Sequence, residues 1–212
     1  LNGDTTFALA LEAQRRNHEI FYFQPDDLFL KSNEVLAKIC KIELFSNNVE
    51  NNYKYFNKVI KPLSEYDVVM MRQDPPFDLS YITATHILEK IPSKTLVVNN
   101  PYEVRNAPEK IFVTNFSHLM PETLITKDIK IIKSFRAEFK DIIIKPLYGN
   151  GGQGVFHVLP EDENFYSIIE MFFNQKELLF IKNWLFSFIK RALHMHVIVP
   201  KKDFQSLEKN KD

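Results

Sequence analysis

The 212-residue sequence predicts an α/β protein whose N-terminal part is a parallel layered sheet. Short apolar runs at 68–71 and 96–98 are typical of buried parallel strands, and a segment with helical spacing, 81–90, lies between them. Strand and helix therefore alternate, as in units that place helices over both faces of a sheet. Four of the five glycines gather between Gly149 and Gly154, directly after an apolar strand, which indicates a second unit of a different kind.

The first half is expected to begin with a helix and a strand. Asp4 or Thr5 can cap a helix that runs to about Arg16, and a strand follows at 19–23. The polar residues 2–6 at the start of this helix are of a kind that normally follows a strand, and that strand would lie upstream of Leu1. The stretch 31–61 is polar, rich in asparagine and only weakly periodic, so we interpret it as a variable excursion.

The second half is expected to open with a helix near Pro108, because proline is favoured in a first helical turn. A strand at 123–126, a helix at 128–139 and a strand at 142–145 follow. The glycine loop then leads into another strand, 154–159. In a Walker A or Rossmann loop the glycines lead into a helix, so this order predicts a hairpin flap instead.

Composition gives only broad limits. Lys plus Arg equals Asp plus Glu at 27 each, so no overall charge favours nucleic acid or an anionic membrane as a partner. The single cysteine, Cys40, excludes an internal disulfide and fits a reducing compartment. We find no signal-peptide pattern and no apolar run long enough for a membrane span, and we interpret the protein as cytoplasmic.

Lys145 and the glycine cluster form the clearest candidate site. Lys145 ends an apolar strand, where its ammonium group could neutralise phosphate charge beside the flap. The alternative is a lysine that extends from the strand into solvent, followed by a mobile hairpin. Lys110 lies near the start of a helix, where the helix dipole disfavours a cation, and this hints at an anionic partner. Taken alone, Lys110 would more often be a solvated lysine.

A second candidate is the loop 71–78, which follows a buried strand and contains two prolines. In α/β proteins, loops at the carboxyl ends of strands bind ligands. Arg72 could bind a substrate carboxylate, with Asp74 beside it. Pairing of Arg72 with Asp74 or Asp78, simply to hold the loop, is about as well supported.

Several motifs together resemble bacterial glutathione synthetase, in consistent order through about residue 178. These are Gly3-Asp-Thr-Thr-Phe-Ala with Glu12-Ala-Gln-Arg-Arg16, Met71-Arg-Gln-Asp-Pro-Pro-Phe-Asp78, Val98-Asn-Asn-Pro101 with Pro108-Glu-Lys-Ile-Phe112, and Ile143-Ile-Lys-Pro-Leu-Tyr-Gly-Asn-Gly-Gly152. The resemblance implies a pre-ATP-grasp α/β domain over residues 1–107. It also implies a partial ATP-grasp domain, a lid with a glycine-rich flap, over residues 108–178.

The resemblance also implies a reaction. ATP phosphorylates the cysteinyl carboxylate of γ-glutamylcysteine, and the amine of glycine attacks the acyl phosphate to give glutathione, ADP and phosphate. Mg²⁺ is the implied metal, with Mn²⁺ as an alternative. Lys110 and Lys145 match the two lysines that contact ATP phosphates. The implied flap residues are Gly149, Asn150, Gly151, Gly152 and Gly154. Positioning and charge neutralisation suffice for this chemistry, so no catalytic side chain is predicted.

The segment 179–212 departs from the family. It has apolar residues at helical spacing from Phe180 to Leu193, and residues 182–212 carry seven basic and three acidic side chains, a net charge of +4. We interpret it as a divergent tail produced by an altered reading frame, with packing onto the lid or membrane binding as alternatives. Two metal-ligand candidates in this tail are weak, namely Glu208 with Asn210 and His194 with His196.

Three hypotheses therefore stay open. The first is a glutathione synthetase, EC 6.3.2.3, whose small-molecule partners are γ-glutamylcysteine, glycine and ATP. The second is a truncated, non-catalytic remnant or ATP-binding module of that family. The third is an ATP-grasp ligase with other substrates. A homo-oligomer is compatible with each of them.

Overall fold

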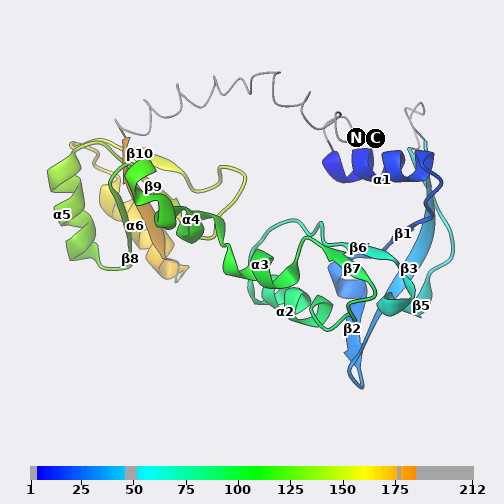
Figure 1. Cartoon of the computed structure of the whole chain (residues 1–212). Helices are drawn as coiled ribbons and strands as arrows, with labels where there is room; N and C mark the ends of the chain where they lie inside the picture. The colour runs from blue at the N-terminus through cyan, green and yellow to red at the C-terminus, as the bar shows by residue number, and fades with distance from the viewer. Residues whose placement is uncertain (1–3, 46–51, 176–177, 185–212) are drawn as a thin grey trace, which may run out of the picture. The chain divides into compact units, whose positions relative to one another are not determined.

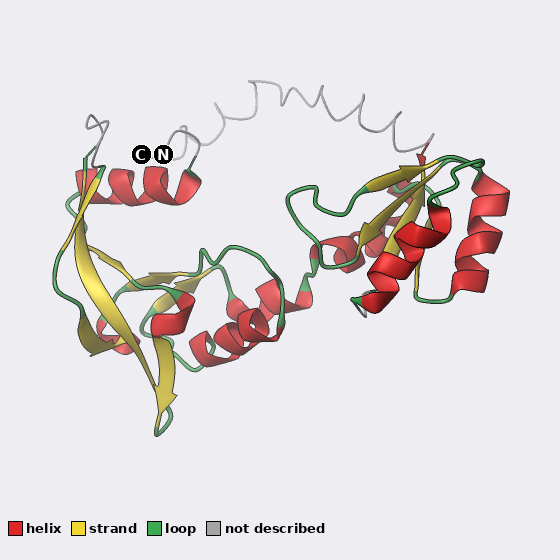
Figure 2. Ribbon diagram, turned by 180° about the vertical axis from the view of Figure 1, so that it is seen from behind, coloured by secondary structure: helices red, strands yellow, loops and turns green. Residues whose placement is uncertain are grey.

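The computed structural model describes residues 4–45, 52–175 and 178–184. The chain forms two units, residues 1–112 and 113–212, and each is described by itself (Figures 1 and 2). Both contain helices and sheets, which confirms the predicted α/β class.

The first unit is built around one long strand, β3 (Glu34–Leu44). Four short strands pair antiparallel with it: β1 (Ile20–Tyr22), β2 (Leu28–Lys31), β4 (Tyr53–Tyr55) and β5 (Val59–Pro62). Our interpretation of 31–61 as a variable excursion is therefore wrong for most of its length. The long strand is visible in Figure 2 as the extended yellow ribbon of this unit.

Alternating burial along β3 explains why it forms. Val35, Ala37 and Ile39 are buried in one core, which they share with Leu63, Val69, Met71, Leu88 and Ile91. Further along, Cys40, Ile42 and Leu44 are buried under helix α1 (Thr5–Arg15), whose Phe7, Ala10 and Leu11 pack against them. Successive side chains of a strand point to opposite faces. Ile39 and Cys40 are adjacent and both buried, so the buried face of β3 changes there, and the strand contributes to one core before this point and to the other core after it.

Helix α1 starts and ends close to where the sequence predicts. The carboxylate of Asp4 accepts hydrogen bonds from the backbone N–H groups of Thr6 and Phe7, at 2.9 and 3.0 Å. Asn17, just beyond the last turn, has a positive φ of 67°, a conformation that asparagine tolerates better than most residues. These are the cap and exit that the sequence indicates.

The predicted parallel pairing holds for β6 (Val68–Met70) and β7 (Leu96–Val98), which pair in parallel. Helix α2 (Leu79–Leu88) lies between them in sequence and is capped by Asp78. A short helix that we did not predict, α3 (Pro101–Asn106), follows β7. It leads into α4 (Glu109–Phe112), which begins one residue after Pro108.

The second unit begins with a 3₁₀ segment, η3 (Val113–Leu119), and contains one antiparallel sheet with the strand order β10-β9-β11-β8. Its strands are β8 (Thr123–Thr126), β9 (Ile142–Pro146), β10 (Phe156–Val158) and β11 (Leu179–Asn183). Helices α5 (Ile129–Phe139) and α6 (Phe165–Asn174) contribute Ile132, Phe165, Ile169 and Phe172 to the core that this sheet buries. Asp128 caps α5 as predicted.

Strand β11 corrects the prediction that apolar residues from Phe180 onward form an amphipathic helix. Residues 179–183 are extended and pair with β8 on one side and β9 on the other. Leu179 and Ile181 are fully buried. The predicted tail beyond Trp184 lies outside the described residues, and the domain limits at 107–108 and 178–179 stay a prediction.

We predict that Ile181→Ala destabilises the second unit by about 2–5 kcal/mol, because it removes buried methyl groups and leaves a cavity in the core. The matched control is Ile131→Ala, since Ile131 on α5 is 48% exposed. It should change stability by about 0.5 kcal/mol or less. The measurement is urea unfolding followed by the fluorescence of Trp184, the only tryptophan. Equal effects of the two variants would show that β11 is not part of the core.

Candidate functional site

The glycine-rich segment forms a hairpin flap between two paired strands. Strands β9 and β10 pair antiparallel, with Ile144 opposite Phe156, which confirms the predicted strand–loop–strand order. At the start of the loop the backbone N–H of Leu147 donates to the carbonyl of Leu178, 2.9 Å away. The flap therefore begins at a point that is hydrogen-bonded to the start of β11.

The flap glycines serve two different purposes. Gly151 and Gly152 have positive φ angles of 58° and 77°, and a side chain added at either would meet no atom within 4 Å. Gly149 and Gly154 are instead close to other groups, since a Cβ at Gly149 would overlap the Pro146 ring. A Cβ at Gly154 would lie 3.3 Å from the Phe172 ring. The ends of the flap are thus packed, and its middle faces open space.

Lys145 lies on the sheet face opposite α5 and α6. Ile142 and Ile144 belong to the core under these helices, so the alternation of a strand directs Lys145 to the other face. In the register of the sheet Lys145 is directly opposite Phe180 of β11. Its Nζ atom lies 4.9 Å from the centroid of the Phe180 ring, a distance typical of a cation–π contact. The half-buried lysine is thus held beside a buried ring, one residue before Pro146.

Two more rings lie on the same face. In the register of the sheet, His157 of β10 is opposite Ile143 of β9. Ile143 precedes Lys145 by two residues, so the side chains of His157, Ile143 and Lys145 point to the same face. Its ring stacks on the indole of Trp184, with centroids 4.4 Å apart and planes inclined by 30°. This face therefore combines a cation with stacked planar rings, a combination that suits an anionic ligand with an aromatic base.

Lys110 lies in α4, which belongs to the first unit, whereas Lys145 and the flap belong to the second. Only 9% of Lys110 is exposed, which is unusual for a lysine. A long cationic side chain that is held in this way has lost much of its conformational freedom before any ligand arrives.

Arg72 contacts neither of the carboxylates that the sequence suggests. Its Nη2 atom donates to the hydroxyl of Thr5 at 2.6 Å, and its Nε atom donates to the hydroxyl of Thr6 at 3.2 Å. Asp78 accepts instead from the backbone N–H of Tyr81 and caps α2. The guanidinium group is thus tied to the first turn of α1 by two neutral acceptors, and its positive charge is not cancelled there.

Asp74 is exposed in the same loop. Burial raises the pKa of Tyr81 above its ordinary value, and the negative charge of Asp74 adds to this effect. The carboxylate is thus close enough to influence a neighbouring phenol. The contacts of Arg72 with Thr5 and Thr6 were not predicted, because they join segments that are far apart in the sequence.

Within the described part of the chain, no group of three His, Cys, Asp or Glu side chains could hold a metal ion. No helix in these ranges is long and apolar enough to cross a membrane. The weak metal candidates, Glu208 with Asn210 and His194 with His196, lie outside the described residues.

Two family models match this chain. The N-terminal domain of prokaryotic glutathione synthetase matches residues 1–105, and its ATP-grasp domain matches residues 109–194. The second match continues past residue 178, where the motifs in the sequence end.

Curated relatives agree with these models. Glutathione synthetase of Mesorhizobium japonicum is 57% identical over 170 residues, which cover 80% of this chain and 54% of the relative. That of Brucella melitensis is 56% identical over 173 residues, 81% of this chain and 55% of the relative. That of Buchnera aphidicola from Schizaphis graminum is 42% identical over 188 residues, 87% of this chain and 58% of the relative. The chain spans about half the length of these relatives.

Among solved structures, the ATP-grasp ligase PsnB in complex with a precursor variant, Mg and ADP is similar at a TM-score of 0.48 and 16% identity, over 86% of this chain and 62% of that chain. The matches of the two domain models, in order and over most of the sequence, identify this chain as a member of the prokaryotic glutathione synthetase family.

Proposed function

We propose that this chain belongs to an ATP-dependent ligase that joins γ-glutamylcysteine to glycine. The observation that carries the proposal is the flap, whose open glycines directly follow the strand that presents Lys145. The proposal is supported by the match of this segment to the ATP-grasp domain model of the family.

Lys145 and the flap would bind the phosphates of ATP. Backbone N–H groups in a loop with positive φ angles can converge on an anion, and Gly151 and Gly152 supply such a loop. Lys145 adds a charge that neutralises the phosphate oxygens as the γ-phosphoryl group leaves. Lys110 of α4 is our second candidate for a lysine that contacts ATP phosphates. Asn150, between the open glycines and the packed Gly149, would contribute its amide to the same site.

The proposed reaction is the one that the resemblance to the family implies, and these groups would stabilise its phosphoryl transfer. A carboxylate oxygen of γ-glutamylcysteine attacks the γ-phosphorus, which breaks the bond to the bridging oxygen and releases ADP. The amine of glycine then attacks the acyl carbon, loses a proton and displaces phosphate, so that an amide bond replaces the acyl phosphate. Neither step needs a nucleophile from the protein, and orientation together with charge neutralisation lowers both barriers.

Family membership implies a divalent metal ion, and we propose Mg²⁺, with Mn²⁺ as the alternative. When bound, the ion would neutralise phosphate charge. Among the described residues no group of three His, Cys, Asp or Glu side chains could hold the ion, so no step is assigned to them through the metal.

Arg72 is our candidate for a substrate carboxylate. Its guanidinium is exposed and oriented by two hydroxyl groups, which leaves its charge to attract an anion. Asp74 would favour the ammonium group of the same kind of substrate.

A cytosolic location fits the buried thiol of Cys40, whose pKa is raised by burial and which is therefore a poor nucleophile.

We predict that Lys145→Met weakens the binding of ATP with Mg²⁺ about 10-fold or more, because a charge-assisted contact to phosphate is lost. Titration calorimetry on the full chain measures this affinity. Lys130→Met is the matched control, since Lys130 lies on α5, on the other side of the same unit. Equal affinity of the Lys145 variant and the unaltered chain would remove Lys145 from the site.

Glutathione formation tests the whole proposal. The chain is incubated with γ-glutamylcysteine, glycine, ATP and Mg²⁺, and glutathione and phosphate are quantified. Equal amounts of both products support the ligase. Tight ATP binding without glutathione would instead identify an ATP-binding module, and product from other amine and acid pairs would indicate a ligase with other substrates.

We further predict that Gly149→Ala impairs ATP binding more than Gly151→Ala does. The new methyl group at Gly149 overlaps the Pro146 ring and displaces the flap, whereas the one at Gly151 enters open space. Gly151→Ala carries only the cost of a positive φ, roughly 1–2 kcal/mol. The two variants are compared by calorimetry with ATP and by urea unfolding. A greater loss of affinity in Gly151→Ala would contradict the packed role of Gly149.

A further inference from the structure

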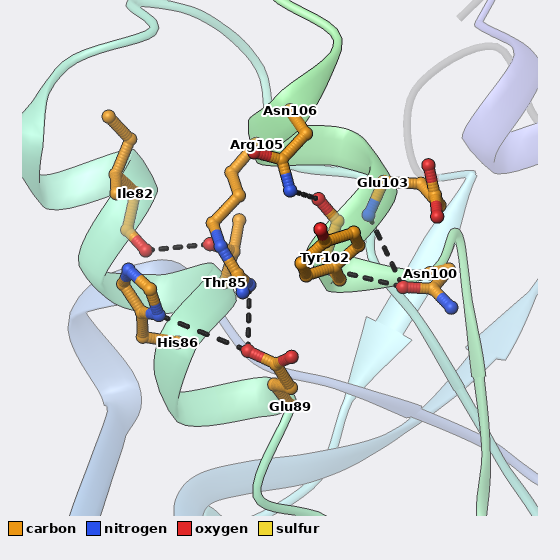
Figure 3. A network of polar contacts seen from close by, with 9 residues as sticks. All are labelled: Ile82, Thr85, His86, Glu89, Asn100, Tyr102, Glu103, Arg105 and Asn106. Atoms are coloured by element: carbon orange, nitrogen blue, oxygen red, sulfur yellow. Dashed lines mark hydrogen bonds and ion pairs between the residues drawn. The ribbon is translucent and has the colours of Figure 1, made fainter.

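Helix α3 is short and is held in place by polar side chains (Figure 3). At its start the Asn100 side chain accepts from the backbone N–H groups of Tyr102 and Glu103, at 2.9 and 3.3 Å. At its end the Asn106 side chain donates to the carbonyl of Tyr102, 2.8 Å away. A helix of six residues is not stable by itself, so its position depends on such anchors.

Arg105 is the polar anchor between α3 and α2, beside the apolar contact that Val104 makes with the core containing Leu88 of α2. Its Nη1 atom lies 2.8 Å from Oε2 of Glu89, at the end of α2, and its guanidinium carbon lies 4.9 Å from the centroid of the Tyr102 ring. The side chain is only 14% exposed. The contact with Glu89 is an ion pair rather than a well-aligned hydrogen bond, because Nη1 has no hydrogen-bond partner by geometry.

The surroundings of Glu89 are mostly cationic. Arg105 lowers the pKa of Glu89 most strongly, and His86 and Lys90 act in the same direction. Nδ1 of His86 lies 3.9 Å from Oε2 of Glu89, farther away than Nη1 of Arg105 at 2.8 Å. Glu89 therefore stays ionised over the neutral pH range, and the anchor of α3 is present there.

The path from Arg105 to Lys110 leaves little freedom. Arg105 lies in the last turn of α3, and Pro108, whose φ angle is fixed by its ring, comes directly before α4. The carbonyl of Pro108 accepts from the backbone N–H groups of Ile111 and Phe112, at 3.0 and 2.8 Å. Only four residues separate Arg105 from Lys110, so a shift of α3 against α2 would also displace the start of α4, where the buried Lys110 lies.

We propose that Arg105, held by Glu89, is a positioning residue that fixes Lys110 for binding the phosphates of ATP. This inference rests on the proposed function, in which Lys110 contacts ATP. A general role in folding would be different, because it would change the stability of the first unit without depending on Lys110.

A double-mutant cycle on the full chain separates these roles. The variants are Arg105→Met, Lys110→Met and the two combined, and the probe is ATP with Mg²⁺ in titration calorimetry, at a temperature where all variants are folded. We expect Lys110→Met to weaken affinity about 10-fold and Arg105→Met about fivefold. The combined variant should be no weaker than Lys110→Met alone, because Arg105 acts through Lys110.

Two further variants complete the design. Glu89→Gln removes the charge that holds Arg105 and should weaken ATP affinity in the same direction. Its matched control is Glu65→Gln, which breaks an exposed ion pair with Lys61 in the same unit and should leave affinity unchanged. If Arg105→Met does not fold, Arg105→Lys takes its place in the cycle, since lysine keeps the charge and loses the planar group.

The outcomes separate this inference from the proposed function. Losses that multiply in the combined variant, or unchanged affinity in the Arg105 variants while Lys110→Met binds poorly, overturn the positioning role and leave the ATP site in place. If Lys110→Met binds as well as the unaltered chain, the role of Lys110 fails and the positioning role with it. If the unaltered chain does not bind ATP, both fail.

Discussion

The contact between Pro146 and the flap glycines is the constraint on which the second unit depends. Pro146 is buried at the end of β9, and its ring occupies the space where side chains at Gly149 and Gly154 would lie. Phe172 of α6 closes the same space from the helical side. The two ends of the flap are thus packed against Pro146 and Phe172, whereas a side chain at Gly151 or Gly152 would meet no atom within 4 Å.

This arrangement joins the flap and Lys145 into one piece. Lys145 directly precedes Pro146, and its partner across the sheet, Phe180, belongs to the buried strand β11. Since β11 also pairs with β8, the position of Lys145 is determined by the whole sheet and not by one loop. A site whose charges are held before the ligand binds needs little reorganisation during the reaction, and such preorganisation is what phosphoryl transfer requires.

Local signals in the sequence predicted much of the fold. Asp4 and Asp128 mark the starts of α1 and α5 because their carboxylates satisfy free N–H groups of the first turn, a short-range effect. Strand β3 was not predicted, although apolar residues alternate from Val35 to Leu44 and Ser32-Asn33 before it is a typical turn pair. The asparagine-rich residues after the strand favoured the interpretation as an irregular segment. The contacts of Arg72 with Thr5 and Thr6 join distant segments, which no local pattern can reveal.

Strand β11 shows why tertiary packing must decide where the family-like part of the chain stops. Phe180 and Ile181 fit both a helical and an extended pattern, since a short apolar run does not distinguish a buried strand from a helix. In the structure Ile181 is fully buried between Leu124 of β8 and Ile144 of β9, its partners in register. A segment read in another frame would not be expected to supply apolar residues at the positions that this core requires. The buried residues of β11 thus lie inside the ATP-grasp domain match, which covers residues 109–194, and the altered reading frame stays a prediction for the part of the tail after them.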